Sequence, residues 1–123
     1  MAIDIGTSII SLNKKGGNSH EFVIKGEPTT ESEYNLQVKF VSGVDSSNNT
    51  SIFSDTQPYT WSEVSTEKTA LQTAYDNNEY QRDRVNAYPS IQDQLDMQYW
   101  DNVNSTTTWK DAIAKVKSDN PKG

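Results

Sequence analysis

The chain has no cysteine and only one histidine, and both scarcities restrict the chemistry of its side chains. Without cysteine there is no disulfide, no thiolate metal ligand and no thiol nucleophile. A Ser-His-Asp triad would have to be built around His20, and a zinc site there would depend on carboxylates, which alone make a poor zinc cage. His20 opens an expected strand beside a glycine turn, where an ordinary exposed histidine is the simpler interpretation. We therefore expect a protein that is not an enzyme and that carries no metal or cofactor.

Clusters of basic residues and long apolar runs are also missing. The 11 lysines and arginines are scattered among 17 acidic residues, the net charge is −6 and the pI is about 4.6. Nucleic acids and anionic membrane surfaces both attract grouped Lys and Arg. No apolar run approaches the roughly 20 residues of a membrane span, and the first residues do not resemble a signal peptide. We expect no nucleic-acid or membrane partner, and a protein made in a cytoplasm.

Apolar residues are only 33% of the 123 residues, and the mean hydropathy is −0.82. The length is that of one ordinary domain or of two small parts. A core of this composition must be thin. Two interpretations stay open: a subunit of a larger or elongated assembly, and a plain hydrophilic domain.

The hydrophobic pattern changes near Pro58. Before this residue apolar positions recur with period two, which is typical of strands, and after it with period three to four, which is typical of helices. The sequence therefore predicts an α+β protein. A strand-rich N-terminal part over residues 1–58, with a small antiparallel sheet, should precede a helical C-terminal module over residues 59–123.

The clearest strand signal is the alternation of Tyr34, Leu36, Val38 and Phe40 with polar residues. Other strands are expected over residues 3–12 (interrupted by Gly6), 20–25 and 52–53, the last after a polar loop over residues 45–50. Gly16 and Gly17 are expected in a hairpin-type turn, because glycine accepts positive φ without a steric cost.

Three capped helices are predicted in the second part. Thr60 and Glu63 have the spacing of a capping box, so a long helix should begin at Trp61. If it continued to residue 87 it would be ~40 Å long, so either residues 77–78 break it or the molecule is extended. Ser90 can cap a second, short helix. Thr108 and Asp111 have another cap spacing, so a third helix should follow Thr108 and end at residues 119–121.

Two groups of oxygen-bearing side chains could have either a functional or an ordinary structural role. Asp93 and Asp96 share a helix face, as a pair of catalytic carboxylates could, but they suit the solvated side of the helix better. Asp45 with Asn48 and Asn49 could hold calcium, but the loop lacks the regular acidic spacing of calcium loops. An ordinary turn is the preferred interpretation.

Large side chains are concentrated in the helical part. They suit either a core, since a small helical module needs large residues to bury enough area, or a docking surface, where Trp and Tyr anchors supply most of the binding energy. The candidate core or docking residues are Trp61, Tyr88, Ile91, Leu95, Trp100, Trp109, Ile113 and Val116.

The C-terminal residues also carry a family resemblance. The segments that carry it are EYQRDR (residues 79–84), AYPSIQDQLDM (87–97), YW (99–100) and TTTW (106–109), followed by residues 112–113, 116–117 and 121–122. Together they resemble the short C-terminal module of bacteriophage tail-associated proteins, both XkdW-like and tail-fibre-associated, which is common in marine cyanophages. Gln92 and Asn120 depart from the usual Gly and Tyr. The resemblance extends over about residues 62–122, and the first half resembles no family.

The resemblance implies a virion structural or assembly role and transfers no catalytic residues. It implies a tail-associated subunit (tail fibre, baseplate or neck) that binds other phage virion proteins and is oligomeric within the assembly. Such a protein is made in the host cytoplasm and resides in the virion. The alternatives are a chaperone that helps tail fibres to fold and then leaves the particle, and, less favoured, an enzyme such as a carboxylate hydrolase.

Overall fold

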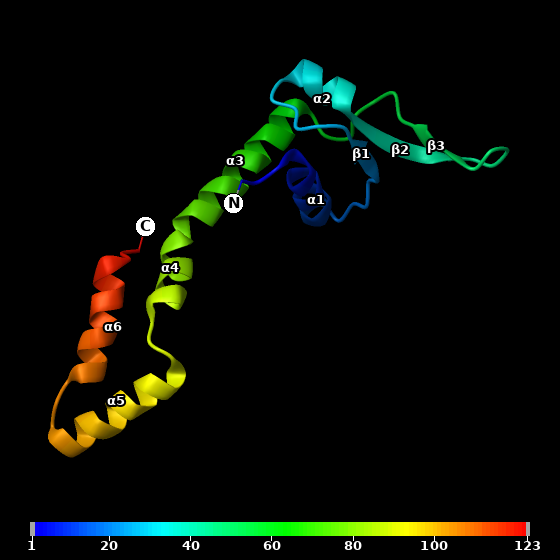
Figure 1. Ribbon diagram of the computed structural model, residues 1–123. Coiled ribbons are helices and arrows are strands. Elements are labelled where there is room, and N and C mark those ends of the chain that lie inside the picture. The colour runs from blue at the N-terminus through cyan, green and yellow to red at the C-terminus, as the bar shows by residue number, and fades with distance from the viewer. Residues whose placement is uncertain (1, 123) are drawn as a thin grey trace. The chain divides into compact units, whose positions relative to one another are not determined.

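The computed structural model describes residues 2–122 and is an α+β protein, as the sequence predicts (Figure 1). The chain divides into two compact units, of which unit 1 extends to Thr73 and unit 2 begins at Ala74. The elements in chain order are α1 (Ile5–Gly16), β1 (Phe22–Ile24), α2 (Glu31–Gln37), β2 (Val38–Asp45), β3 (Thr50–Phe53), α3 (Trp61–Asn77), α4 (Glu79–Ala87), α5 (Ile91–Asn104) and α6 (Thr108–Asp119).

Helix α1 replaces the strand predicted over residues 3–12. Asp4 caps it, since its carboxylate accepts a 2.7 Å hydrogen bond from the backbone N–H of Thr7. Ile5 and Ile9 are four residues apart and fully buried on one side of the helix. Gly17 ends the helix with a φ of 66°, so its positive φ serves a helix terminus and not the predicted hairpin. The cap at Asp4 and the four-residue spacing outweigh the short alternation around Ile3.

Helix α2 and strand β2 divide the segment that was predicted as one strand over residues 34–40. Thr30 caps α2: its hydroxyl accepts from the N–H of Glu33 at 3.2 Å and donates to the Glu33 carboxylate at 3.4 Å. The Thr-x-x-Glu spacing of this cap was hidden by the alternating pattern. The strand begins only at Val38, so Tyr34 enters the core from a helix. Leu36, predicted to be on the buried side, is exposed.

The sheet has the order β1-β2-β3, and both pairings are antiparallel. The first half of β2 pairs with β1, with Phe22 opposite Phe40, and the second half pairs with β3, with Asp45 opposite Thr50. The two halves are separated by an irregularity in the register between Val41 and Gly43. The strands predicted over residues 20–25 and 52–53 are therefore confirmed in this sheet.

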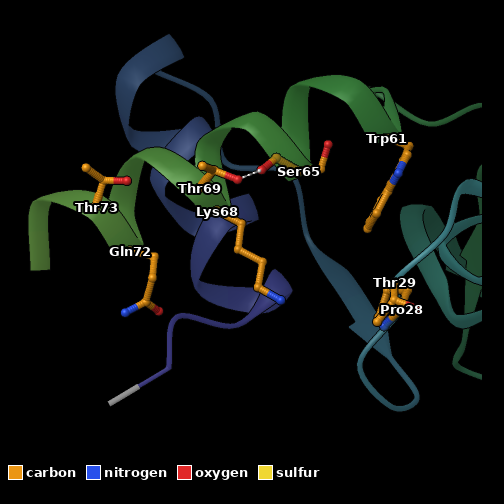
Figure 2. A pocket seen from close by; sticks show the side chains of 8 residues that line it. All are labelled: Pro28, Thr29, Trp61, Ser65, Lys68, Thr69, Gln72 and Thr73. Carbon is orange, nitrogen blue, oxygen red and sulfur yellow. Dashed lines mark hydrogen bonds between the residues drawn. The ribbon is translucent and has the colours of Figure 1, made fainter. Parts of the chain in front are cut away.

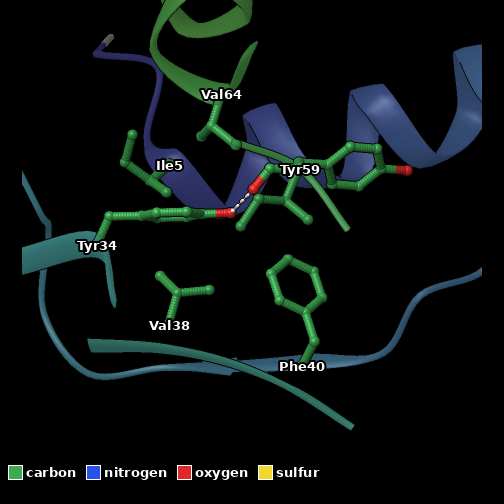
Figure 3. Packing of buried hydrophobic residues seen from close by; sticks show 7 residues of the cluster. Ile5, Tyr34, Val38, Phe40, Tyr59 and Val64 are labelled. Atoms are coloured by element: carbon green, nitrogen blue, oxygen red, sulfur yellow. Dashed lines mark hydrogen bonds between the residues drawn. The ribbon is translucent and has the colours of Figure 1, made fainter. Parts of the chain in front are cut away.

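The core of unit 1 lies between α1, α2, the sheet and the start of α3 (Figure 3). Its buried members are Ile5, Ile9, Tyr34, Val38, Phe40, Tyr59 and Val64. The ring of Tyr34 lies between Ile5 and Val38, and its hydroxyl donates a 2.8 Å hydrogen bond to the carbonyl of Tyr59. Burial of this polar group is thereby compensated.

A polar contact joins α3 to α1. Glu67 is only 7% exposed, and its carboxylate accepts from the hydroxyl of Ser11 at 2.7 Å and from the ammonium of Lys15 at 2.9 Å. The first turns of α3 thus belong to unit 1, through Val64 and Glu67. For this reason the compact units divide within α3, later along the chain than the predicted boundary at residue 58.

The long predicted helix is interrupted at Asn78, one of the two residues expected to break it. The Thr60 hydroxyl accepts from the N–H of Glu63 at 3.1 Å, as the capping-box spacing predicts. In unit 2, Arg82 lies over the ring of Tyr75 at 3.6 Å and donates to the carbonyl of the same residue at 2.9 Å. These contacts stabilise the turn between α3 and α4.

Helices α5 and α6 form a hairpin, and α6 also contacts α4 (Figure 1). The hydroxyl of Ser90 accepts from the N–H of Asp93 at 3.1 Å, which confirms the predicted cap of α5. Pro89 precedes this cap and separates α4 from α5, because proline disfavours helical geometry in the residue before it. Helix α6 ends at Asp119, as expected from Pro121, but Thr108, expected as its cap, is its first helical residue.

Candidate interaction surface

Helix α6 is held at both ends by side chains from its two neighbours in unit 2. At its N-terminus the carboxylate of Asp101 accepts from the N–H groups of Thr108 at 2.9 Å and Trp109 at 2.8 Å. At its C-terminus the guanidinium of Arg84 donates to the carbonyl of Asn120 at 2.8 Å. The anion lies at the positive end of the helix dipole and the cation at the negative end, so both contacts stabilise the packing of α6.

The surroundings of Asp101 keep its carboxylate ionised. The hydroxyl of Thr106 donates to it at 2.6 Å and is the largest cause of a lowered pKa, followed by the N–H of Trp109 and then by Thr108. A lowered pKa is expected for a carboxylate whose charged form accepts several hydrogen bonds. The carboxylate of Asp101 therefore has a structural role, which is to hold the start of α6.

Helix α5 turns polar groups toward α6. Gln94 accepts from the indole N–H of Trp109 at 3.2 Å and donates to the carbonyl of Pro89 at 2.8 Å. One turn from the end of the helix, Asp101 makes the capping contacts. The side of α5 that contacts α6 is therefore partly hydrophilic, and the apolar residues of α5 have to face elsewhere.

Those apolar residues form a stripe on the exposed face of α5. Four large side chains follow one another at intervals of four residues, which places them along one side of the helix. We call this set the α5 stripe: Ile91, Leu95, Tyr99 and Val103. Their exposed fractions run from 55% to 71%, and within the described residues no element covers them. An ordered row of exposed apolar side chains is typical of a protein-binding helix.

One edge of the stripe is acidic and aromatic. Asp93, Asp96 and Trp100 lie there, one helical turn apart, and Trp100 is 56% exposed with its ring edge-to-face against Tyr99 at 5.0 Å. Beside Trp100 the surface is hollowed by a cavity of about 330 Å³. Its lining includes Asp96, Met97, Trp100 and the turn that precedes α6.

Among the described residues, the large side chains of the helical module do not all pack into the one core that was predicted. Val116 is buried, Tyr88 and Ile113 are half-buried, and Trp109 is 37% exposed, but Ile91, Leu95 and Trp100 are more than half exposed. Trp61 belongs to unit 1, where its ring lies 5.7 Å from that of Tyr34. The core interpretation is thus wrong for α5, because the helix presents Gln94 and Asp101 to α6, and the docking interpretation stays open there.

A second hollow lies on unit 1, between α3 and the loop at Pro28 (Figure 2). The indole of Trp61 points toward Pro28, and Ser65, Thr69 and Lys68 continue the wall along the helix. Lys68 pairs with Glu27 at 3.2 Å. This arrangement of one tryptophan, hydroxyls and a paired lysine is a groove without a reactive group.

The residues weighed for catalysis have ordinary surroundings. The ring of His20 packs edge-to-face against Tyr59 at 5.6 Å and near Phe40 at 6.5 Å, and among the described residues no hydrogen bond joins its imidazole to a carboxylate. Asp93 and Asp96 are exposed, and along residues 2–122 their carboxylates have no hydrogen bond or ion pair.

The oxygens of the loop between β2 and β3 are used within the loop. Asp45 accepts from the N–H and the hydroxyl of Ser47 at 2.9 and 2.6 Å, and Asn48 accepts from the hydroxyl of Thr50 at 2.6 Å. These are the side-chain turns that Asp and Asn favour. Over the described part of the chain there is no group of three or more His, Asp or Glu side chains able to hold a metal ion.

Three functional features of α5 were missed from the sequence. Val103 completes the stripe, and its position could have been predicted from the four-residue interval that starts at Ile91. The roles of Asp101 and Gln94 were missed because their partners lie across a helical hairpin. A local sequence pattern cannot predict a cap that another helix supplies.

Across residues 2–122 no helix combines the length and the apolar character needed to cross a membrane. No family model matches the chain, and the comparisons with curated proteins and with solved structures give no match either.

Proposed function

We propose that this chain is a bacteriophage virion structural protein, a tail-associated subunit of the tail fibre, baseplate or neck. It acts by protein–protein binding and has no enzymatic role. The support from the sequence is the resemblance of residues 62–122 to the C-terminal module of phage tail-associated proteins. The protein would be made in the host cytoplasm and reside in the virion.

The observation that carries the proposal is the exposed α5 stripe. A monomeric soluble protein rarely presents a contiguous row of large apolar side chains without a use for it. The helix that presents this row is itself well anchored, since Ser90 caps it and Asp101 joins its end to α6. A rigid helix with an exposed apolar face is suited to binding a groove or a second helix.

The partners in this proposal are other virion proteins, and the protein is oligomeric within the assembly. The thin core of unit 1 and the exposed stripe of unit 2 both suit a subunit that is completed by its neighbours. Hydrophobic area covered in the particle would then supply stability that the isolated chain lacks.

Mass spectrometry of purified particles tests the proposal. A structural subunit is present in a fixed ratio to the other tail proteins, whereas an assembly chaperone acts during tail fibre folding and is absent from finished particles. Presence at a fixed ratio supports the subunit, and absence from particles that still need the gene would favour the chaperone.

A variant of the stripe tests which surface is used. Leu95→Gln with Tyr99→Gln should leave the chain folded but reduce its amount in particles, because two apolar contacts are lost. Val85→Gln is the matched control, since Val85 is 72% exposed on α4 and outside the stripe. Equal incorporation of both variants would argue against the stripe as the binding surface.

A further inference from the structure

We infer that the α5 stripe binds an amphipathic segment of another protein whose apolar side chains are flanked by Lys or Arg. This inference rests on the proposed function, in that it names the chemistry of the partner.

The charge around the stripe has one sign. Between Arg84 and Lys110 the chain has no lysine or arginine, while Asp93, Asp96 and Asp101 all fall within this stretch. Asp101 uses its carboxylate to cap α6, but its charge stays in place. Asp93 and Asp96 have no partner among the described residues, so a cation brought by another protein would find both carboxylates free.

The hollow beside Trp100 gives one such cation a definite place. The lining of this hollow combines two acidic residues, Asp96 and Asp101, with the large side chains of Trp100 and Met97. Arginine suits this combination, because its guanidinium stacks on aromatic rings and pairs with carboxylates. No basic residue of the chain lines the hollow.

A second copy of this chain fits the stripe less well. Two copies of α5 packed against each other would bring Asp93 and Asp96 near equally acidic flanks, and like charges at an interface oppose association. The stripe is also short, at ~18 Å from Ile91 to Val103. A stable dimer usually buries about 800 Å² on each partner, which is more than such a strip offers alone.

Synthetic peptides of the same length as α5 can test the partner chemistry on the intact chain. The first peptide has leucines along one helix face and arginines at its flanks, and the second has citrulline in place of each arginine. Citrulline keeps the size and loses the charge. Titration at low salt should show the arginine peptide binding roughly fivefold more tightly, from a few exposed charge pairs. High salt should reduce that preference.

Two variants with the same change in net charge locate the effect. Asp96→Asn should lower the preference for arginine to about twofold or less. Asp83→Asn removes a charge from α4, outside the stripe and the hollow, and should leave the preference unchanged. Trp100→Leu should weaken binding of the arginine peptide more than binding of the citrulline peptide. Circular dichroism establishes that each variant is folded.

The inference is overturned by equal binding of the two peptides, or by a preference that Asp96→Asn and Asp83→Asn reduce equally. It is also overturned if sedimentation shows that the chain dimerises and that Leu95→Gln abolishes the dimer. These measurements use the isolated chain and are independent of virion composition. Peptide discrimination without incorporation into particles would refute the proposed function alone, and incorporation without discrimination would refute the inference alone.

Discussion

The carboxylate of Asp101, near the end of α5, accepts a 2.8 Å hydrogen bond from the backbone N–H of Trp109, in the first turn of α6. One side chain thereby fixes the hairpin between the two helices and satisfies N–H groups that a helix start leaves unpaired. The contact also orients α5, because the side that holds Asp101 must face α6.

Substitution of Asp101 should therefore loosen the hairpin. Asp101→Asn keeps the size but loses the charge that favours the N-terminus of α6, and its amide can no longer accept at both oxygens. We expect a thermal midpoint lower by roughly 4 °C or more, measured by circular dichroism. Asp111→Asn is a control in the first turn of α6, where among the described residues the carboxylate accepts only from the Thr107 hydroxyl. An equal loss in both variants would contradict a special role for Asp101.

The effect of Asp101 should depend on pH in one direction. The hydrogen bond from Thr106, with those from Trp109 and Thr108, lowers the pKa of Asp101 below its ordinary value of 3.8. The unfolded chain then takes up this proton at higher pH than the folded chain does. The contribution of Asp101 to the unfolding free energy is complete above the ordinary pKa, and it is lost as the pH falls through the lowered pKa of the folded state. The gap in thermal midpoint between wild type and Asp101→Asn should be constant from neutral pH to about 5 and shrink below about 4. A gap that widens in acid would refute the assignment.

Helices α1 and α2 were not predicted from the sequence, and both show where local patterns mislead. In α2 the alternation of Tyr34, Leu36 and Val38 is real, but Thr30 accepts from the N–H of Glu33 and so caps a helix before the strand. In α1 the cap at Asp4 outweighed the alternation around it. The starts of α3 and α5 were predictable because their caps, Thr60 and Ser90, lie immediately before them in the sequence.

The placement of α5 was not predictable from the same signals. Its apolar spacing was visible, but a helix can turn such a face toward its own chain or away from it. The choice depends on the contacts of Gln94 and Asp101 with α6, which join residues more than one helical turn apart across a loop. The sequence could identify the residues of the surface, and the structure was needed to show that they are exposed.

Glu67 should be the most sensitive acidic residue of unit 1. Its pKa is lowered by the hydrogen bond from Lys15 and then by that from Ser11, against the opposing effect of burial. Glu67→Gln loses the charge-assisted part of both bonds and should cost about 1 to 2 kcal/mol of unfolding free energy. Urea unfolding measures the change. Glu63→Gln alters an exposed residue of the same helix and should change stability by less than about 0.5 kcal/mol. Similar losses in the two variants would show that the contact with α1 is unimportant.

Substitutions at Leu95 and Val116 should change the unfolding free energy by very different amounts, although both residues were predicted as candidates for one core. Val116 is 9% exposed, and Val116→Ala removes buried methyl groups at a cost of about 2 kcal/mol. Leu95 is 58% exposed, and Leu95→Gln should change the unfolding free energy by less than about 0.5 kcal/mol. Chemical denaturation distinguishes the two. A large loss for Leu95→Gln in the monomeric chain would mean that the α5 stripe is covered within the molecule.

Tyr34 should make unit 1 sensitive to alkali. Burial, with smaller effects from Glu63 and Tyr59, raises the pKa of the Tyr34 phenol above its ordinary value. The folded state therefore holds this proton to higher pH than the unfolded state does. The contribution of the Tyr34 phenol to the unfolding free energy is complete below about pH 10 and is lost as the pH rises through the raised pKa. At neutral pH, Tyr34→Phe should cost about 1 to 2 kcal/mol, because the carbonyl of Tyr59 loses its donor.

The decisive quantity is the difference in unfolding free energy between wild type and Tyr34→Phe as pH rises. Other tyrosines and the lysines titrate in both proteins, so their effects cancel in the difference. The difference should narrow above about pH 10, because only the wild-type unfolded chain gains stability by ionising this phenol. Tyr99→Phe, at an exposed position on α5, should show no such trend. If the gap for Tyr34→Phe stays constant into strong alkali, the Tyr34 phenol ionises equally well in both states and is not sealed within the core.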